Sequence, residues 1–197
     1  FKRLFNHISP KGLIFFWCFI DSLVKFPAFP HYTQPGTRES VPASYPGNAP
    51  GRLDNMSFPT LNIGDLCAKI PIVQGGMGVG ISLSRLASAV AKEGGIGVIA
   101  GAMIGMKEPD VARNPIEANK RALAAELRKA RAATDGIIGV NIMVALTTFT
   151  ELARTAIEEK ADVIFSGAGL PMDLPRILSD VCEEKKEQFR TKLVPIV

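Results

Sequence analysis

Residues 70–80 read IPIVQGGMGVG, and this stretch decides the fold class. Its first half is a short apolar run typical of a buried strand, and its second half is a loop with almost no side chains. Such a loop lets a large flat ligand approach the backbone closely. A second break of this kind, Ser166-Gly167-Ala168-Gly169, follows the strand-like run 162–165. We therefore predict one cofactor-binding mouth built from loops that follow strands.

Strand-like runs alternate with helical patterns downstream of residue 56. The runs lie at 70–74, 96–101, 137–143, 162–166 and 192–197, and the helical patterns lie at 82–93, 114–133, from 147 or 148 onward, and at 175–190. This order predicts a parallel sheet covered by helices. A repeat of about 30 residues fits either an open doubly wound sheet or a (β/α)8 barrel. Periodicity leaves both alternatives open.

The helical patterns also predict which side chains face the core and which residues begin each helix. Ser82 is expected to cap the first helix, Pro115 to occupy the first turn of the second, and Thr147 or Thr148 to cap the third. The expected inward-facing residues are Leu83, Leu86, Ala87, Val90, Leu123, Leu127, Ala130, Leu152, Ala156 and Ile157.

Charge and cysteine content exclude several classes of function. The chain carries a net charge of +4, but residues 56–197 hold seventeen Lys or Arg against sixteen Asp or Glu. No basic stripe marks a nucleic-acid surface, so we predict no nucleic-acid partner. Three dispersed cysteines form no CxxC pair and predict a reducing, cytoplasmic location. We expect Cys67 and Cys182 to be packed as small apolar side chains.

Residues 1–55 differ from the rest of the sequence. The apolar run 13–20 is too short to cross a bilayer, which needs about 20 residues, and no small-residue cleavage site follows it. Residues 27–50 contain six prolines and few apolar residues, a disordered composition. We predict that 1–55 is a doubtful or disordered extension, outside the native coding sequence, and that the protein begins near Met56. A membrane-tethering arm is the alternative.

Two glycine motifs resemble nucleotide-binding fingerprints and fail on context. Residues 95–100 match G-x-G-x-x-A, but they follow a helix and lead into a strand, whereas the fingerprint requires the opposite order. Gly94 and Gly95 are better explained as a helix stop with a left-handed glycine. The loop 75–80 follows a strand but has G-x-G-x-G spacing and lacks the Lys-Ser/Thr of a phosphate loop.

Polar residues end three of the predicted strands: Gln74, Asn141 and Ser166. The carboxyl ends of parallel strands are where such folds bind ligands. A buried amide without partners costs about 1–3 kcal/mol, so Asn141 must reach a hydrogen-bonding partner. We favour a ligand for Asn141, and leave ligand and structural roles open for Gln74 and Ser166. The only histidines, His7 and His31, lie in the extension, and no cluster has metal-ligand spacing, so we predict no metal.

Four stretches together resemble the nitronate monooxygenase family and its relatives, the FMN-dependent enoyl-acyl-carrier-protein reductases. They are PIVQGGMGVGIS at 71–82, LASAVAKEGGIGVIAG at 86–101, GVNIM at 139–143 and ADVIFSGAGLP at 161–171. The resemblance implies an FMN-binding TIM-type (β/α)8 barrel. This chain would supply about four βα units and a fifth strand, with residues 56–197 as the N-terminal half.

The resemblance also implies roles for particular residues. Gly76, Met77 and Gly78 would lie against the flavin, Asn141 would hydrogen-bond it, and the loop 166–169 would line the mouth. The candidate cofactor-binding set is Gln74, Gly75, Gly76, Met77, Gly78, Asn141, Ser166 and Gly167. No catalytic residue is expected in this chain, because the family's histidine would lie beyond Val197.

The predicted function is oxidation of alkyl nitronates with O2 by an FMN oxidoreductase. An NAD(P)H-dependent FMN enoyl reductase is one alternative, and a non-catalytic half-barrel scaffold that binds a partner is the other. The partners expected are a small-molecule substrate and O2, with no membrane and with a homo-oligomer left open. We expect a half-barrel to leave its sheet edges at 70–74 and 192–197 unpaired, and Ile72, Val98, Ile142 and Ile164 partly exposed.

Overall fold

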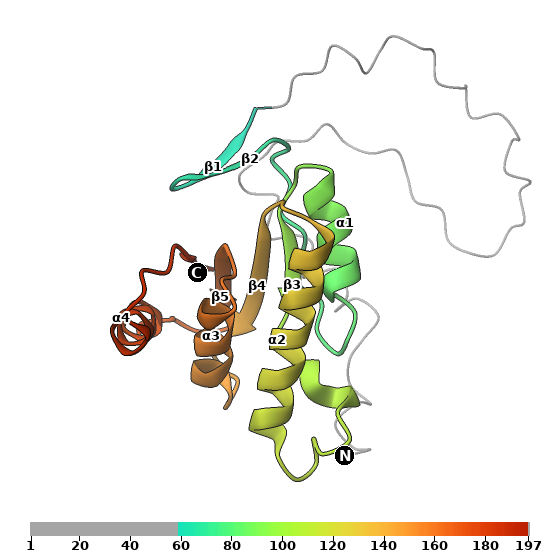
Figure 1. The fold of residues 1–197 in the computed structure, drawn as a ribbon, viewed down its shortest axis with the longest axis vertical. Helices are drawn as coiled ribbons and strands as arrows, with labels where there is room; N and C mark the ends of the chain where they lie inside the picture. The colour runs from blue at the N-terminus through green and yellow to red at the C-terminus, as the bar shows by residue number, and fades with distance from the viewer. Residues whose placement is uncertain (1–58, 197) are drawn as a thin grey trace, which may run out of the picture. The chain divides into compact units, whose positions relative to one another are not determined.

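The structure, a computed structural model, describes residues 59–196. These residues form a short β-hairpin followed by alternating helices and parallel strands (Figure 1). The predicted extension 1–55 and the start at Met56 lie outside the described residues. The strands are β1 (Leu61–Ile63), β2 (Leu66–Ala68), β3 (Gly97–Ala100), β4 (Ile138–Met143), β5 (Val163–Gly167) and β6 (Lys192–Pro195). The helices are α1 (Ser84–Lys92), the 3-10 turn η3 (Ile104–Lys107), α2 (Pro115–Ala133), α3 (Phe149–Glu158) and α4 (Leu174–Lys185).

The main sheet is parallel and follows chain order, β3-β4-β5-β6. Val98 aligns with Gly139, Asn141 aligns with Phe165, and Ile164 aligns with Leu193. Each connection runs through a helix, as parallel neighbours require. The predicted α/β class with a parallel sheet is therefore confirmed.

The predicted strand 70–74 is wrong as a full strand. Only Val73 forms a bridge, pairing in parallel with Ile96. Pro71 has no N–H to donate to a ladder. Farther along, the side chain of Gln74 takes the Val98 N–H and C=O that a continuing backbone would use. The segment thus lies beside β3 and extends the sheet by a single rung.

The two faces of the sheet carry different cores. One face packs against the helices, and its strand residues include Ile99, Val140, Ile142 and Ile164. The other face holds Ile96, Val98, Val163 and Phe165 together with residues of the β1–β2 hairpin. The expectation that Val98, Ile142 and Ile164 are partly exposed is wrong, because all three are at most 1% exposed; Ile72 is 58% exposed.

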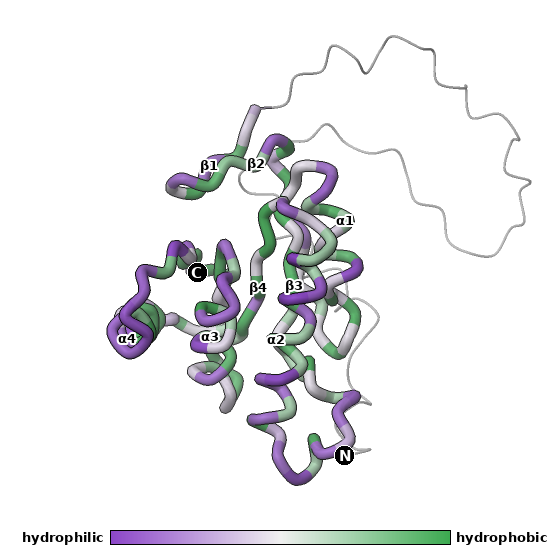
Figure 2. The backbone as a smooth tube through the Cα atoms, in the orientation of Figure 1, coloured by the Kyte–Doolittle hydropathy of each residue, from purple (hydrophilic) through white to green (hydrophobic). Residues whose placement is uncertain are grey.

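Helix α2 agrees closely with its sequence pattern. Pro115 opens it, and Leu123, Leu127 and Ala130 are fully buried. Figure 2 shows hydrophilic and hydrophobic residues alternating along α2, whereas β4 is largely hydrophobic. The same pattern holds in α3, where Thr148 precedes the first turn and Leu152, Ala156 and Ile157 are buried.

Helices α1 and α4 differ from their predicted bounds. Helix α1 begins at Ser84, and neither the predicted cap Ser82 nor Leu83 makes a side-chain capping bond to it. Leu86, predicted to face inward, is 45% exposed. Helix α4 stops at Lys185 because Lys186 adopts the left-handed conformation, with φ of 53°. Cys67 is exposed on β2 and Cys182 is partly buried, so close packing is wrong for Cys67.

The hairpin and the turn η3 are absent from the sequence predictions. Three-residue strands give little periodicity, which explains the omission. The turn between β1 and β2 is held to β6 through Asp65, whose carboxylate pairs with Lys192 and Arg190. The hydrogen bond from Lys192 lowers the pKa of Asp65. In residues 59–196, no helix combines the length and apolar character needed to cross a membrane.

Candidate functional site

The glycine loop 75–80 leaves the sheet at Gln74. The Gln74 N–H donates to the Ile96 carbonyl at 3.0 Å. Its side-chain Nε2 donates to the Val98 carbonyl at 3.0 Å, and its Oε1 accepts from the Val98 N–H at 3.2 Å. The amide therefore imitates one more rung of backbone pairing, and the chain turns away from β3 at Gly75. This use of the amide favours the structural role that the sequence left open for Gln74.

Ser82 gives the loop its shape. Its hydroxyl accepts from the Met77 N–H at 3.0 Å and donates to the Gly75 carbonyl at 3.3 Å. The Ser82 N–H also donates to the Met77 carbonyl at 2.9 Å, and Ser82 is 2% exposed. Sequence reasoning assigned Ser82 to a helix cap and missed this positioning role. Its proximity to a side-chain-poor loop was the available signal, since serine hydroxyls commonly bond nearby backbone in such loops.

Gly76 lies directly against Asn141 at the carboxyl end of β4. A Cβ placed on Gly76 would be 2.6 Å from Asn141 Cβ and 3.3 Å from its Oδ1, closer than van der Waals contact allows. Asn141 is partly buried, and its side-chain amide forms no hydrogen bond with residues 59–196. A partly buried amide without a protein partner is available to a ligand.

The remaining glycines of the loop have different surroundings. A Cβ on Gly78 would be 2.9 Å from Ala102 Cβ, and the Val79 N–H donates to the Ala102 carbonyl at 3.0 Å, so this part is tied to the loop after β3. A Cβ on Gly75 would meet nothing within 4 Å. Gly75 is thus the point where the backbone is open to an approaching molecule.

Exposed apolar side chains gather at the carboxyl ends of the strands and in the loops that follow them. They are Met77 at 64% exposure, Val79, Ile81, Met103, Met106, Met143, Leu170, Met172 and Ile196. Isolated exposed apolar residues need no explanation, but a group in consecutive loops at one end of a sheet indicates a binding surface. Methionine thioethers pack well beside aromatic rings.

The structure separates Ser166 from Gly167. Residues alternate between faces along β5, so Ser166 shares the helix-covered face with Ile164, whereas Gly167 shares the face of Phe165 and Asn141. Ser166 is fully buried, and its hydroxyl has no hydrogen-bond partner in the described chain. Gly167 aligns with Met143, and its carbonyl accepts from the Val144 N–H at 2.8 Å. Gly76, Asn141 and Gly167 therefore share one face, and the Ser166 side chain lies on the other.

The eight predicted residues are all uncharged, and the charges nearby sit in a polar frame behind the loop. Glu126 of α2 accepts from the Ser84 N–H at 3.0 Å and from the Ser84 hydroxyl at 2.5 Å, which fixes the start of α1. Burial alone raises the pKa of Glu126, but hydrogen bonds from Lys129 and Ser84 outweigh it. The pKa of Glu126 therefore lies below its ordinary value of 4.5.

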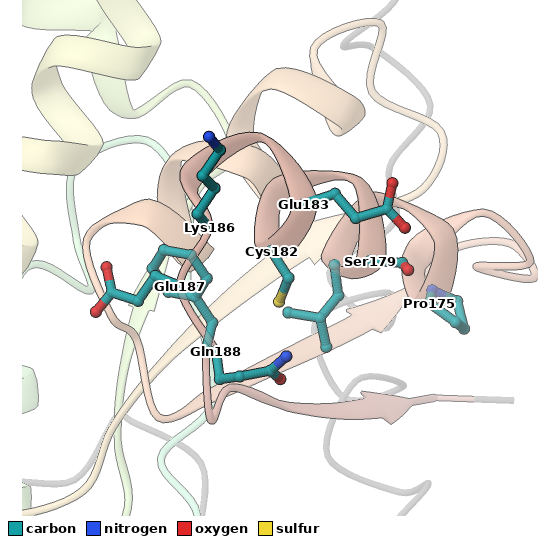
Figure 3. Close-up of a pocket in the computed structure, with 9 residues that line it drawn as sticks. Pro175, Ser179, Cys182, Glu183, Lys186, Glu187 and Gln188 are labelled. Carbon is teal, nitrogen blue, oxygen red and sulfur yellow. The ribbon is translucent and has the colours of Figure 1, made fainter.

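A cavity of about 370 Å³ after β5 is lined by Leu170 and Met172, two of the exposed apolar side chains described above, and by Pro195. Other cavities lie elsewhere. One of about 640 Å³ runs along α4 and residues 186–189, where Cys182 points into it and Lys186 points away (Figure 3). None of the predicted site residues lines it. It lacks converging polar groups at a strand end, which mark ligand sites in parallel α/β folds. We therefore place the candidate site at the glycine loop and Asn141.

These features define an α/β protein whose candidate ligand site lies at the carboxyl ends of parallel strands. A family model described as nitronate monooxygenase matches residues 61–189. The chain belongs to the nitronate monooxygenase family, which is a family of oxidoreductases. The resemblance inferred from the sequence is thereby confirmed.

Solved structures give a partial likeness. FabK from Thermotoga maritima is 30% identical, with a TM-score of 0.47 over 64% of this chain and 33% of that chain. A point mutant of the same protein is 29% identical, with a TM-score of 0.48 over 64% of this chain and 35% of that chain. The chain thus spans about a third of the length of these structures. The comparison with curated proteins gives no match.

Proposed function

We propose that this chain is part of an FMN-dependent nitronate monooxygenase, which oxidises alkyl nitronates with O2. The observation that carries the proposal is the close approach of Gly76 to Asn141, whose amide has no hydrogen-bond partner among residues 59–196, beside the open Gly75. Membership of the nitronate monooxygenase family supports the same reaction class. The substrate partners are then a small alkyl nitronate and O2.

The residues present fit the ring of a flavin. Gly75 leaves open space above the backbone, and the Asn141 amide has both a donor and an acceptor for a polar ring edge. Met77 and Met103, 64% and 57% exposed, supply polarizable surface for an aromatic ring. When bound, FMN would take electrons from the nitronate and pass them to O2.

The work of this chain in the reaction is positioning. Gln74 and Ser82 fix the loop, so that Gly75 and Gly76 stand ready without reorganisation when a ligand binds. The apolar side chains of the rim exclude water from the bound ring, which strengthens hydrogen bonds made there. We assign no proton transfer to this chain, since none of the eight candidate residues titrates in the physiological range.

We also propose that the complete fold is a TIM-type (β/α)8 barrel. The strands follow chain order without a reversal, and the helices share one face of the sheet. A doubly wound sheet reverses its strand order and carries helices on both faces. Sequential order with helices on one side therefore supports the barrel, with Asn141 and Gly167 on its inner face.

A reducing, cytoplasmic location is part of the same proposal. Within residues 59–196, Cys67 and Cys182 form no disulfide, and unpaired cysteines are typical of reducing compartments. A mass measurement before and after thiol alkylation of protein isolated from its source would check it. Recovery with a disulfide at Cys67 would contradict this location.

Flavin binding tests the site, and turnover tests the reaction. FMN and riboflavin are titrated into the complete gene product while flavin fluorescence is followed. Asn141→Ala should weaken the binding of both ligands by about tenfold, the cost of one ligand hydrogen bond. Asn62→Ala, at an exposed asparagine of β1, is the matched control and should leave binding unchanged. Equal binding by the two variants would contradict the site.

The complete gene product is then assayed for propyl-2-nitronate oxidation and for anaerobic flavin reduction by NADH. Rapid reduction by NADH without nitronate turnover would favour the enoyl reductase alternative. Absence of flavin binding and of both reactions would favour the non-catalytic scaffold.

A further inference from the structure

The loops that follow the strands contain few charges, and their acids are neutralised locally. The charged side chains in these loops are Lys107, Glu108, Asp110, Arg113 and Asp173. Arg121 of α2 pairs with both Glu108 and Asp110, at 3.4 Å and 2.5 Å. Asp173 pairs with Arg176 at 3.2 Å. The uncompensated charge of this rim, among residues 59–196, is therefore positive.

Lys107 is the cation placed against the glycine loop. A Cβ on Gly80 would lie 3.8 Å from Lys107 Cε and 4.0 Å from its Nζ. Gly80 has φ of 75°, which disfavours any side chain that would displace the lysine. Among residues 59–196, Lys107 forms no ion pair with an acidic residue.

The segment that carries Lys107 is held in place on α2. The Gly105 N–H donates to Asn119 Oδ1 at 2.8 Å. The Gly105 backbone also packs on α2, because a Cβ there would be 2.7 Å from the Ala118 carbonyl carbon. The ion pairs of Arg121 anchor the residues that follow. Among residues 59–196, Lys107 is thus a cation without an acidic partner, on an anchored turn that lies beside Gly80 at the end of the glycine loop.

We propose that the Lys107 ammonium binds an oxyanion group of the ligand that occupies the mouth. The inference rests on the proposed function, and it adds the residue that receives the substrate's charge. A nitronate carries a negative charge on its oxygens, and a phosphate on a larger substrate carries the same chemistry. The ammonium offers three N–H donors for an oxyanion.

Amine acetylation of the full chain, read by mass spectrometry at each lysine, tests the inference. The added ions are propyl-2-nitronate, inorganic phosphate and chloride at matched ionic strength, each with and without FMN. We expect propyl-2-nitronate to slow acetylation of Lys107 by about two- to fivefold relative to chloride, the range for an exposed ion pair. Lys92, in the last turn of α1, is the internal control and should not respond.

The choice of ions distinguishes a nitronate from a phosphate as the bound group. The presence or absence of FMN distinguishes failure of the Lys107 proposal from failure of the flavin proposal. Protection by phosphate but not by nitronate would assign the position to a phosphorylated ligand. Protection without FMN binding would leave the oxyanion position standing while the flavin proposal fails. FMN binding with equal acetylation of Lys107 and Lys92 under all ions would overturn the inference.

A pair of variants guards against a purely structural explanation. Lys107→Gln should keep the melting temperature of the parent, because the side chain is exposed and has no ion pair in the described chain. Lys107→Arg should retain the salt-dependent weakening of nitronate binding, and Lys107→Gln should lose it. Equal salt dependence in both variants would contradict a role for the charge.

Discussion

The two glycine-rich stretches of this protein have similar sequences and different physical roles. Residues 75–80 read GGMGVG, and residues 94–97 read GGIG. At Gly97 a Cβ would lie 1.9 Å from the Ala87 carbonyl oxygen, whereas at Gly75 it would meet nothing within 4 Å. Glycine at 97 is required by packing of α1 on β3. Glycine at 75 has no packing reason in the described chain.

This difference separates structural glycines from candidate ligand-binding glycines. Gly94 ends α1 with φ of 91°, and the Gly95 N–H donates to the Val90 carbonyl at 3.3 Å, which closes the helix as predicted. In the loop 75–80, by contrast, a Cβ on Gly75 would meet no atom within 4 Å. Gly75 has no packing constraint among residues 59–196 and lies at a strand end. The close approach of a ligand to its backbone is the best explanation for glycine at this position.

The largest expected effect is at Gly97. Gly97→Ala places a methyl group against the Ala87 backbone, which has no flexible end that can move aside. We expect a loss of about 3 kcal/mol in the free energy of unfolding. Urea denaturation followed by circular dichroism measures it. Stability equal to the parent would show that α1 does not pack on β3 in this way.

A smaller loss of stability is expected at Gly76. Gly76→Ala brings a methyl group to 2.6 Å from Asn141 Cβ, so the loop or the asparagine must shift. We expect a loss of about 1–2 kcal/mol, since the loop has more room to adjust than the α1–β3 contact. Flavin titration should weaken together with stability. Unchanged flavin affinity in a destabilised variant would contradict a contact between Asn141 and the flavin.

Helix α1 joins the two stretches, and its start depends on a carboxylate. The pKa of Glu126 is lowered in the folded state, so its contribution to stability is complete above pH 4.5 and is lost as pH falls through the folded-state pKa. Glu126→Gln should lower the free energy of unfolding by about 1 kcal/mol at neutral pH. This loss is smaller than for a buried charge pair, because Lys129 is exposed to solvent. The difference between parent and variant should shrink below pH 4.5.

Glu117→Gln is the matched control for that change. Glu117 lies on the same helix and pairs with Lys120 at 3.0 Å, but it is 59% exposed. Its effect on stability should be near zero at all pH values. Equal losses in the free energy of unfolding from Glu117→Gln and Glu126→Gln would show that the contact of Glu126 with Ser84 does not stabilise the start of α1.

The fold was predictable where the sequence pattern and the packing agree. Helix α2 has a proline at its start and apolar residues at helical spacing, and both features appear in the structure. The pattern failed at 70–74, because a side chain replaced the backbone as the hydrogen-bonding partner of Val98. The pattern failed again at Lys186, because this residue ends α4 in the left-handed conformation that glycine usually adopts.

The site was predictable as a set of strand ends but not in its detail. The sequence predicted Gly76 and Asn141 as site residues, and the structure brings the glycine loop against Asn141 at the end of β4. Periodicity could not show that Ser166 faces the helices, because a run such as DVIFS gives no reference for which face is inner. Nor could it show that the Ser82 hydroxyl bonds the loop, since both capping and loop-bonding serines precede helices.

No loss of stability is expected from Gly75→Ala, which is the sharpest test of the comparison. The added methyl group meets no atom within 4 Å of its position, and Gly75 is not in the left-handed region that favours glycine. Alanine should therefore be neutral or stabilise by up to about 1 kcal/mol, because it restricts the unfolded chain. If a flavin ring lies over this backbone, the same methyl group occupies the space of the ring, and FMN affinity should fall by about tenfold or more while the fold is intact. Isothermal titration with FMN and with riboflavin, beside urea denaturation of the same variant, measures both quantities. Loss of stability would mean that Gly75 has a packing role like that of Gly97, and unchanged affinity for both flavins would mean that the open space at Gly75 is not where the ligand binds.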